Sequence, residues 1–115
     1  MHRGDVIRVQ LPRPVGKAGH EQFGTRPAIV IQENSATANL STVVIVPLTS
    51  NRLAERLDGS LLVRPTDTNG LAVISVALTQ QIRAIDKSRV EDVIGKLSSE
   101  VMTDIDAALK RLLSL

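Results

Sequence analysis

Residues 26–50 read RPAIVIQENSATANLSTVVIVPLTS and hold two apolar runs, 27–32 and 42–48, that are rich in β-branched side chains. Such runs are typical of buried β-strands. The residues between the runs are mostly turn-forming types and are too few for a helical crossover. We therefore expect the two runs to form an antiparallel hairpin centred near residues 37 and 38.

This hairpin places Arg26 opposite Thr49, with their Cβ atoms about 5 Å apart. Pro27 can open a strand because no backbone donor is needed there, and it biases Arg26 toward an extended backbone. Pro47 restricts the backbone from which Thr49 and Ser50 emerge. The sequence thus predicts an arginine and two hydroxyl groups at one end of the sheet, beside the loop that precedes Arg26.

The chemistry that suits this pair is displacement at phosphorus. A guanidinium group offers forked donors that match phosphate oxygens, and it stays charged at any workable pH. Attack by a ribose 2′-hydroxyl on the adjacent phosphate needs stabilised charge on phosphorus and the movement of a proton between oxygens. Neither a metal nor a cofactor is required. The alternative is structural: Arg26 pairs with Glu21 at a strand edge, and Thr49 satisfies a loop backbone.

The rest of the chain adds strands and one helix. Apolar and polar residues alternate in DVIRVQL (5–11), as in a half-buried strand. Further β patterns occur at 60–65, 71–78, 80–85 and 92–97. TDTNG (66–70) predicts a tight turn, because Asn-Gly is a strong hairpin signal. These patterns favour a mainly β domain with antiparallel strands in a small barrel.

The last eighteen residues, SSEVMTDIDAALKRLLSL, switch to helical spacing. Apolar side chains share one helix face at Val101, Ile105, Ala108, Leu109 and Leu112. Ser98 or Ser99 is a suitable N-cap, and basic side chains near the end suit the negative pole of the helix. We expect this helix to close the barrel.

The composition limits the class of protein. The chain has 115 residues, 43% hydrophobic and 23% charged, which fits one globular domain spanning 1–115. The net charge is only +2, with the basic excess in the first 64 residues. Cysteine is absent, which excludes disulfides and a thiol nucleophile. There is no secretory signal pattern, and the longest apolar run is far short of the ~20 residues of a membrane helix, so we expect a cytoplasmic protein without membrane contact.

In order along the chain, five segments resemble the MazF/PemK family of toxin endoribonucleases. They are RGDVIRVQL (3–11), AGHEQFGTRPAIVIQ (18–32), VVIVPLTS (43–50), GLAVISVALTQQIRAIDKSRV (70–90) and IGKLSSEVMTDIDAALKRLLSL (94–115). Each motif alone is weak, whereas the ordered set covers nearly the whole chain. The resemblance implies the toxin of a type II toxin–antitoxin system, with an SH3-like (PemK/CcdB-like) barrel that acts as a homodimer.

The resemblance also implies an activity and a site. Family members cut single-stranded RNA (mRNA) without a metal and leave 2′,3′-cyclic phosphate and 5′-hydroxyl ends. Their key arginine and threonine match Arg26 and Thr49, the pair that the hairpin brings together. Such a toxin is held inactive by a cognate MazE-like antitoxin, whose acidic segment covers the RNA channel. The predicted RNA-binding residues are Gly19, His20, Glu21, Gln22, Phe23, Ser50, Gln81 and Arg83.

Some roles stay open at this point. His20 is either a helper that titrates near neutrality or a solvated hydrogen-bonding residue beside Glu21. Phe23, the only aromatic residue, either stacks on a base or anchors its loop. Gln80 stands where relatives commonly have an acidic residue. Two alternative functions are compatible with the same fold. One is a CcdB-like toxin that binds gyrase and cuts nothing, and the other is a non-catalytic module that binds only the antitoxin.

Overall fold

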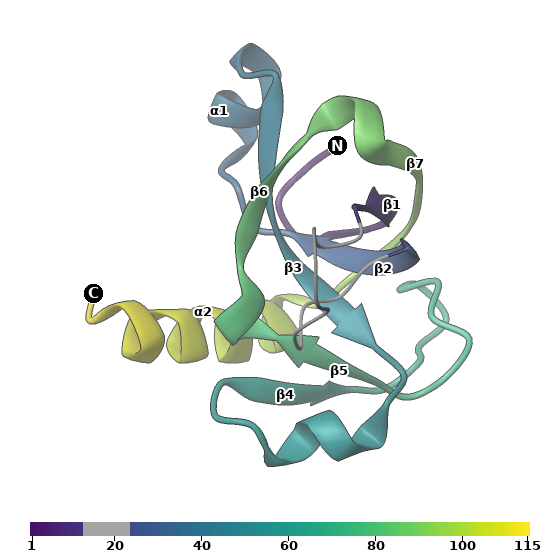
Figure 1. Cartoon of the computed structure of the whole chain (residues 1–115), viewed down its shortest axis with the longest axis vertical. Helices are drawn as coiled ribbons and strands as arrows, with labels where there is room; N and C mark the ends of the chain where they lie inside the picture. Colours follow the sequence, from purple (N-terminus) through teal and green to yellow (C-terminus); the bar gives the residue numbers. More distant parts are fainter. Residues whose placement is uncertain (13–23) are drawn as a thin grey trace.

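The computed structural model describes residues 1–12 and 24–115. The strands are β1 (Asp5–Leu11), β2 (Gly24–Val30), β3 (Thr42–Thr49), β4 (Ser60–Val63), β5 (Ser75–Leu78), β6 (Arg83–Asp86) and β7 (Val90–Lys96). The α-helices are α1 (Asn34–Asn39) and α2 (Ser99–Leu113), and the short 3₁₀ helices are η1 (Arg52–Arg56), η2 (Thr79–Gln81) and η3 (Lys87–Arg89). The predicted class, mainly β with a C-terminal helix, is confirmed (Figure 1).

The described strands form one antiparallel sheet in the order β4-β5-β3-β2-β1-β7, and β6 pairs with β3 beside this path. β3 is central because it pairs with three strands. It pairs with β2, its first half (42–45) also pairs with β6, and its last two residues pair with β5. The strands curve around a common interior in Figure 1. The result is barrel-like, although the path through the described strands stays open between β4 and β7.

The β2–β3 hairpin has the predicted register. Ala28 lies opposite Pro47, and the next two pairs along the ladder keep the same alignment. Continued to the strand ends, this register aligns Arg26 with Thr49. The connector is more ordered than the predicted turn, since it contains α1, whose N-cap is Glu33. A hydrogen bond from the Ser35 hydroxyl, together with backbone N–H donors, lowers the pKa of Glu33.

Two apolar clusters fill the interior. The first gathers side chains of β1, β2, β3 and α2, and Ile105 and Leu109 are its helical members. The second includes Ile7 and Ile45 and lies on the other side of the sheet. Because successive strand residues face opposite ways, β1 contributes Val6 to the first cluster and Ile7 to the second. The central strands are therefore held from both faces.

The predicted tight turn at 66–70 is wrong in its extent. β4 ends at Val63 and β5 begins only at Ser75, so a long connector, 64–74, joins them. Asn69 organises this connector: its side chain is buried, donates to the Arg64 carbonyl at 2.8 Å, and accepts from the backbone N–H groups of Thr66 and Leu71 at 3.1 Å each. The asparagine stabilises a wide loop here instead of a two-residue turn.

Two other predicted strands begin or end elsewhere. The pattern at 80–85 gives a strand only from Arg83, because residues 79–81 form η2. The last strand, predicted at 92–97, begins at Val90 and ends at Lys96. The predicted helix is confirmed, with the Ser98 hydroxyl accepting from the Val101 N–H at 3.2 Å. None of the described helices is long and apolar enough to cross a membrane.

Candidate functional site

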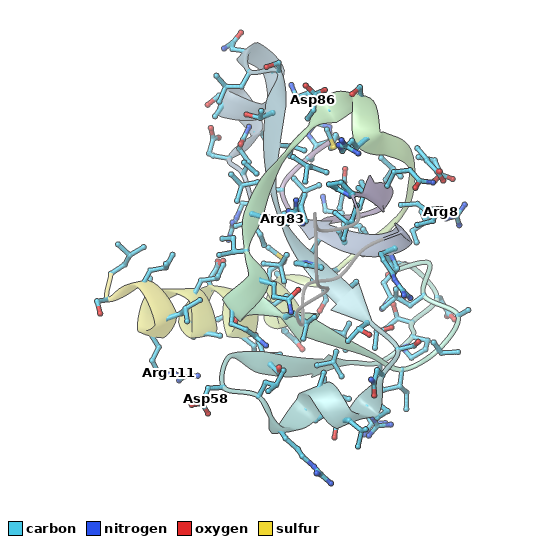
Figure 2. The ribbon with its side chains drawn as sticks, in the orientation of Figure 1. Arg8, Asp58, Arg83, Asp86 and Arg111 are labelled. Carbon is cyan, nitrogen blue, oxygen red and sulfur yellow. The ribbon has the colours of Figure 1, made fainter. Side chains whose placement is uncertain are left out.

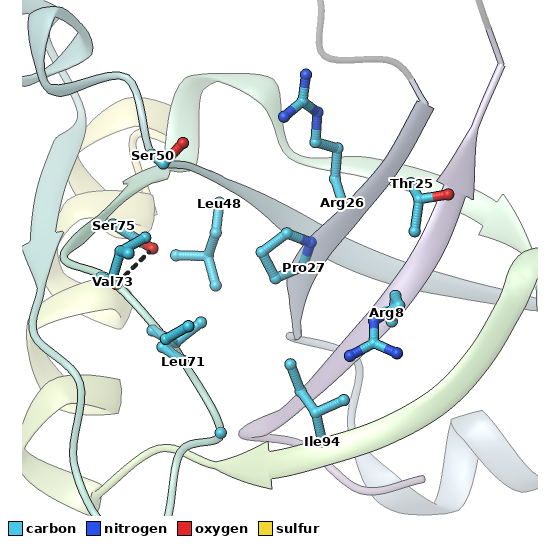
Figure 3. Close-up of a pocket in the computed structure, with 12 residues that line it drawn as sticks. Arg8, Thr25, Arg26, Pro27, Leu48, Ser50, Leu71, Val73, Ser75 and Ile94 are labelled. Atoms are coloured by element: carbon cyan, nitrogen blue, oxygen red, sulfur yellow. Dashed lines mark hydrogen bonds between the residues drawn. The ribbon is translucent and has the colours of Figure 1, made fainter.

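Arg26 lines a cavity of about 260 Å³ at the end of β2 (Figure 3). This cavity, called here the Arg26 cavity, is formed by Arg8, Thr25, Arg26, Pro27, Leu48, Ser50, Gly70, Leu71, Ala72, Val73, Ser75 and Ile94. The strands supply one wall and the 64–74 connector supplies the other. The loop that replaced the predicted tight turn is therefore part of the site.

The Arg26 cavity has an apolar floor with a cation at either end. In Figure 3 the Arg26 guanidinium extends toward the side of Ser50, whereas the Arg8 guanidinium lies on the other side of Pro27, near Ile94. Pro27 lies between the two guanidinium groups, and Leu48 and Leu71 lie to one side of it. A guanidinium group binds phosphate through parallel N–H donors. The cavity thus combines anion-binding groups with a surface suited to a sugar or base.

Thr49 lines a neighbouring cavity of about 350 Å³. This Thr49 cavity is formed by Thr49, Asn51, Leu53, Ala54, Leu57, Leu78 and Gln81. Thr49 is only 6% exposed, and its Oγ1 accepts a hydrogen bond from the Asn51 backbone N–H at 3.2 Å. The hydroxyl oxygen is thus oriented by the chain, and the hydroxyl proton has no acceptor among the described residues.

The structure differs from the prediction in how the hydroxyl groups are shared. The sequence predicts one pocket that holds Arg26, Thr49 and Ser50. The structure has two cavities at the end of β3: Ser50 lines the Arg26 cavity, and Thr49 lines the other. β3 ends at Thr49 and the chain bends at Ser50, so the two hydroxyl residues lie on either side of the strand end. Arg26 and Thr49 therefore lie at the same end of the β2–β3 hairpin but line two adjoining cavities.

The other predicted residues divide into two groups. Gly19, His20, Glu21, Gln22 and Phe23 lie outside the described residues. Their predicted roles remain predictions.

Gln81 lines the Thr49 cavity, and Gln81 and Arg83 also line a smaller cavity with Gln80 and Ile82. Gln80 donates from Nε2 to the Ser60 hydroxyl at 3.3 Å, and its buried Oε1 lacks a hydrogen-bond partner within the described ranges. Because Gln81 lines both cavities, the Thr49 cavity lies next to the smaller one, which Arg83 at the start of β6 also lines.

Sequence reasoning missed Arg8. It occupies an outward position in the alternating pattern of 5–11, and the β1–β2 register places it opposite Pro27. That register depends on where the intervening loop returns, which residue spacing alone does not give. Among residues 1–12 and 24–115, no group of three or more His, Asp or Glu side chains is placed to bind a metal ion.

The chain matches a family model over residues 2–113, described as a PemK-like, MazF-like toxin of type II toxin–antitoxin systems. The endoribonuclease EndoA of Bacillus subtilis is 34% identical over 113 residues, which cover 98% of this chain and 94% of that protein. The match thus spans both proteins almost from end to end.

Two solved structures share the fold. MazF from Deinococcus radiodurans superimposes with a TM-score of 0.80 at 24% identity, covering 100% of this chain and 97% of the other. A mycobacterial endoribonuclease, solved in complex with its cognate antitoxin, gives a TM-score of 0.76 at 23% identity, covering 100% and 96%. At these identities, the likeness supports the fold.

Proposed function

The chain belongs to the PemK-like, MazF-like toxins of type II toxin–antitoxin systems, and on this premise we propose that it is a metal-independent endoribonuclease. Its substrate is single-stranded RNA, mRNA in particular. The 2′-oxygen of one ribose forms a bond to the neighbouring phosphorus, and the bond from phosphorus to the 5′-oxygen breaks. The products carry a 2′,3′-cyclic phosphate and a 5′-hydroxyl group. EndoA, a curated relative matched along nearly the whole chain, carries the name endoribonuclease.

Arg26 and Thr49 are the proposed catalytic residues. A guanidinium group stays protonated at any workable pH and is a poor general base, so Arg26 acts as a clamp for the negative charge that develops on the phosphate oxygens. The Thr49 hydroxyl donates to the same phosphate while its oxygen is held by the Asn51 N–H. The observation that carries this assignment is the β2–β3 register, which pairs Ala28 with Pro47 and, continued by two residues, aligns Arg26 with Thr49.

The assembly follows from the same family. We infer that residues 1–115 form a single domain that acts as a homodimer in the cytoplasm, where mRNA is available. A MazE-like antitoxin restrains it by laying an acidic segment over the basic Arg26 cavity. The mycobacterial relative solved with its cognate antitoxin supports such a partner.

Purified protein is expected to cut a mixed pool of single-stranded RNA in the presence of EDTA, because the proposed mechanism uses no metal. Sequencing of the fragment ends, with a chemical step that distinguishes cyclic phosphates, identifies both the cut site and the end groups. Arg26→Ala protein prepared in parallel controls for contaminating nucleases. If the wild-type protein cuts no RNA in the pool, the endoribonuclease proposal fails, and a non-catalytic role in binding gyrase or the antitoxin replaces it.

A further inference from the structure

Arg8 is a cation that the proposed reaction does not use. It projects outward from β1 in Figure 2 and lines the Arg26 cavity beside Pro27. Its Nη1 donates to Asp92 Oδ2 at 3.5 Å, which is the one polar contact of its guanidinium with the described residues. A guanidinium group has five N–H donors, so most of the donors of Arg8 have no protein acceptor in the described structure.

The ion pair with Asp92 does not hold Arg8 strongly. The distance of 3.5 Å is long for a charge-assisted hydrogen bond, and the side chains are 47% and 50% exposed. Exposed pairs of this kind contribute little to stability. A phosphate can therefore replace the carboxylate at small cost, and Asp92 opposes such binding only through its like charge.

The cavity separates its two arginines by an apolar floor. In Figure 3 Pro27 lies between them and Ile94 lies beside Arg8, and the connector contributes Leu71 and Val73, the latter 54% exposed. A ligand that fits this arrangement has two anionic groups joined by a body with apolar faces. One nucleotide between two backbone phosphates has this form, because the phosphates supply the charge and the base presents flat faces.

We propose that Arg8 binds the RNA phosphate next to the one held by Arg26, so that the Arg26 cavity takes one nucleotide of the substrate. This inference rests on the proposed function. An RNA strand is favoured over an acidic protein segment because the proposed function already places one backbone phosphate at Arg26, and the next phosphate of the same strand is one nucleotide away. Arg8 is thus a positioning residue, which sets how tightly RNA is held and leaves the chemical step to other groups.

The test compares Arg8→Ala with Arg111→Ala, which removes the same charge from α2 at a position that lines neither cavity. The probe is an RNA oligonucleotide carrying 2′-O-methyl groups, which binds but is not cut, followed by fluorescence anisotropy over a salt series. Arg8→Ala is expected to weaken binding about tenfold and to lower the salt slope by about 0.7, the value for one phosphate contact on a single strand. Arg111→Ala is expected to match the wild type.

Cleavable RNA gives a second readout. Arg8→Ala is expected to raise KM about tenfold with kcat within about twofold, because an interaction equal in the ground and transition states changes KM alone. Arg8→Lys keeps the charge and should retain the salt slope. Asp92→Asn removes the competing carboxylate and should tighten binding two- to threefold, an effect that a purely structural role of Arg8 does not produce.

The outcomes separate the two proposals. A dinucleoside monophosphate has only the scissile phosphate, so wild type and Arg8→Ala should bind it equally. The inference about Arg8 is wrong if Arg8→Ala weakens binding of this dinucleotide as much as it weakens binding of the long RNA. It is also wrong if Arg8→Ala and Arg111→Ala bind the long RNA alike. If poly-aspartate binding depends on Arg8 while RNA binding does not, the cavity takes an acidic protein segment instead. Absence of RNA cleavage by the wild type contradicts the proposed function alone, because the binding assay uses RNA that cannot be cut.

Discussion

Arg26→Ala is expected to lower the rate of RNA cleavage by about 10²- to 10³-fold, the range seen when one group that stabilises transition-state charge is removed. The side chain lines an open cavity and lies outside both apolar clusters, so its removal should leave the fold intact. The loss should fall mainly on kcat, because the charge on the phosphate oxygens grows as the 2′-oxygen attacks. Single-turnover cleavage of a defined RNA measures it.

Arg26→Lys is the matched variant. It keeps the positive charge but lacks the planar fork, so it should recover only part of the rate. Circular dichroism and thermal unfolding check that both variants stay folded. Cleavage by folded Arg26→Ala at the wild-type rate would remove Arg26 from the catalytic site.

Gly95→Ala is expected to be strongly destabilising. A methyl group at Gly95 would lie 2.2 Å from the Asn69 carbonyl carbon and 2.6 Å from the Thr68 carbonyl oxygen, and both are backbone atoms. A hydrogen bond also holds the connector against β7 here, because the Lys96 N–H donates to the Thr68 carbonyl at 2.9 Å. Overpacking costs about 1 to 3 kcal/mol and more where the backbone must move. We expect a fall in Tm on the order of 10 °C.

Gly24→Ala provides the control for that variant. It adds the same methyl group where no atom of the described residues lies within 4 Å, so the cost there comes from the positive φ of 81°. Thermal unfolding should give Gly95→Ala a lower Tm than Gly24→Ala. Equal Tm values for Gly95→Ala and the wild type would mean that the 64–74 connector does not pack closely on β7. That result would also undermine the wall of the Arg26 cavity.

Local patterns predicted the elements that depend on neighbouring residues. The two β-branched runs and their short connector gave the β2–β3 register, because few alignments keep both runs buried. Helical spacing from Val101 to Leu109, with a serine cap, gave α2. Leu112, also assigned to the buried face, is 44% exposed because it lies at the end of the helix.

Contacts between distant segments were not predictable in the same way. Asn69 and Gly70 indicate a tight turn locally, yet docking of the 64–74 connector onto β7 selects a wide loop. That docking builds one wall of the Arg26 cavity. The division of the site into two cavities, and the place of Arg8 in one of them, depend on the same long-range packing.

The central claim is that Arg26 and Thr49 act on one phosphate from two adjoining cavities. A double-mutant cycle of single-turnover rates, with Arg26→Ala, Thr49→Ala and the double variant, tests it most directly. Each single variant should slow cleavage by about 10²-fold or more, and the double variant should be little slower than the slower single one, as for groups that act as a unit. Full multiplication of the two losses would contradict the claim, because it would show that the residues act independently.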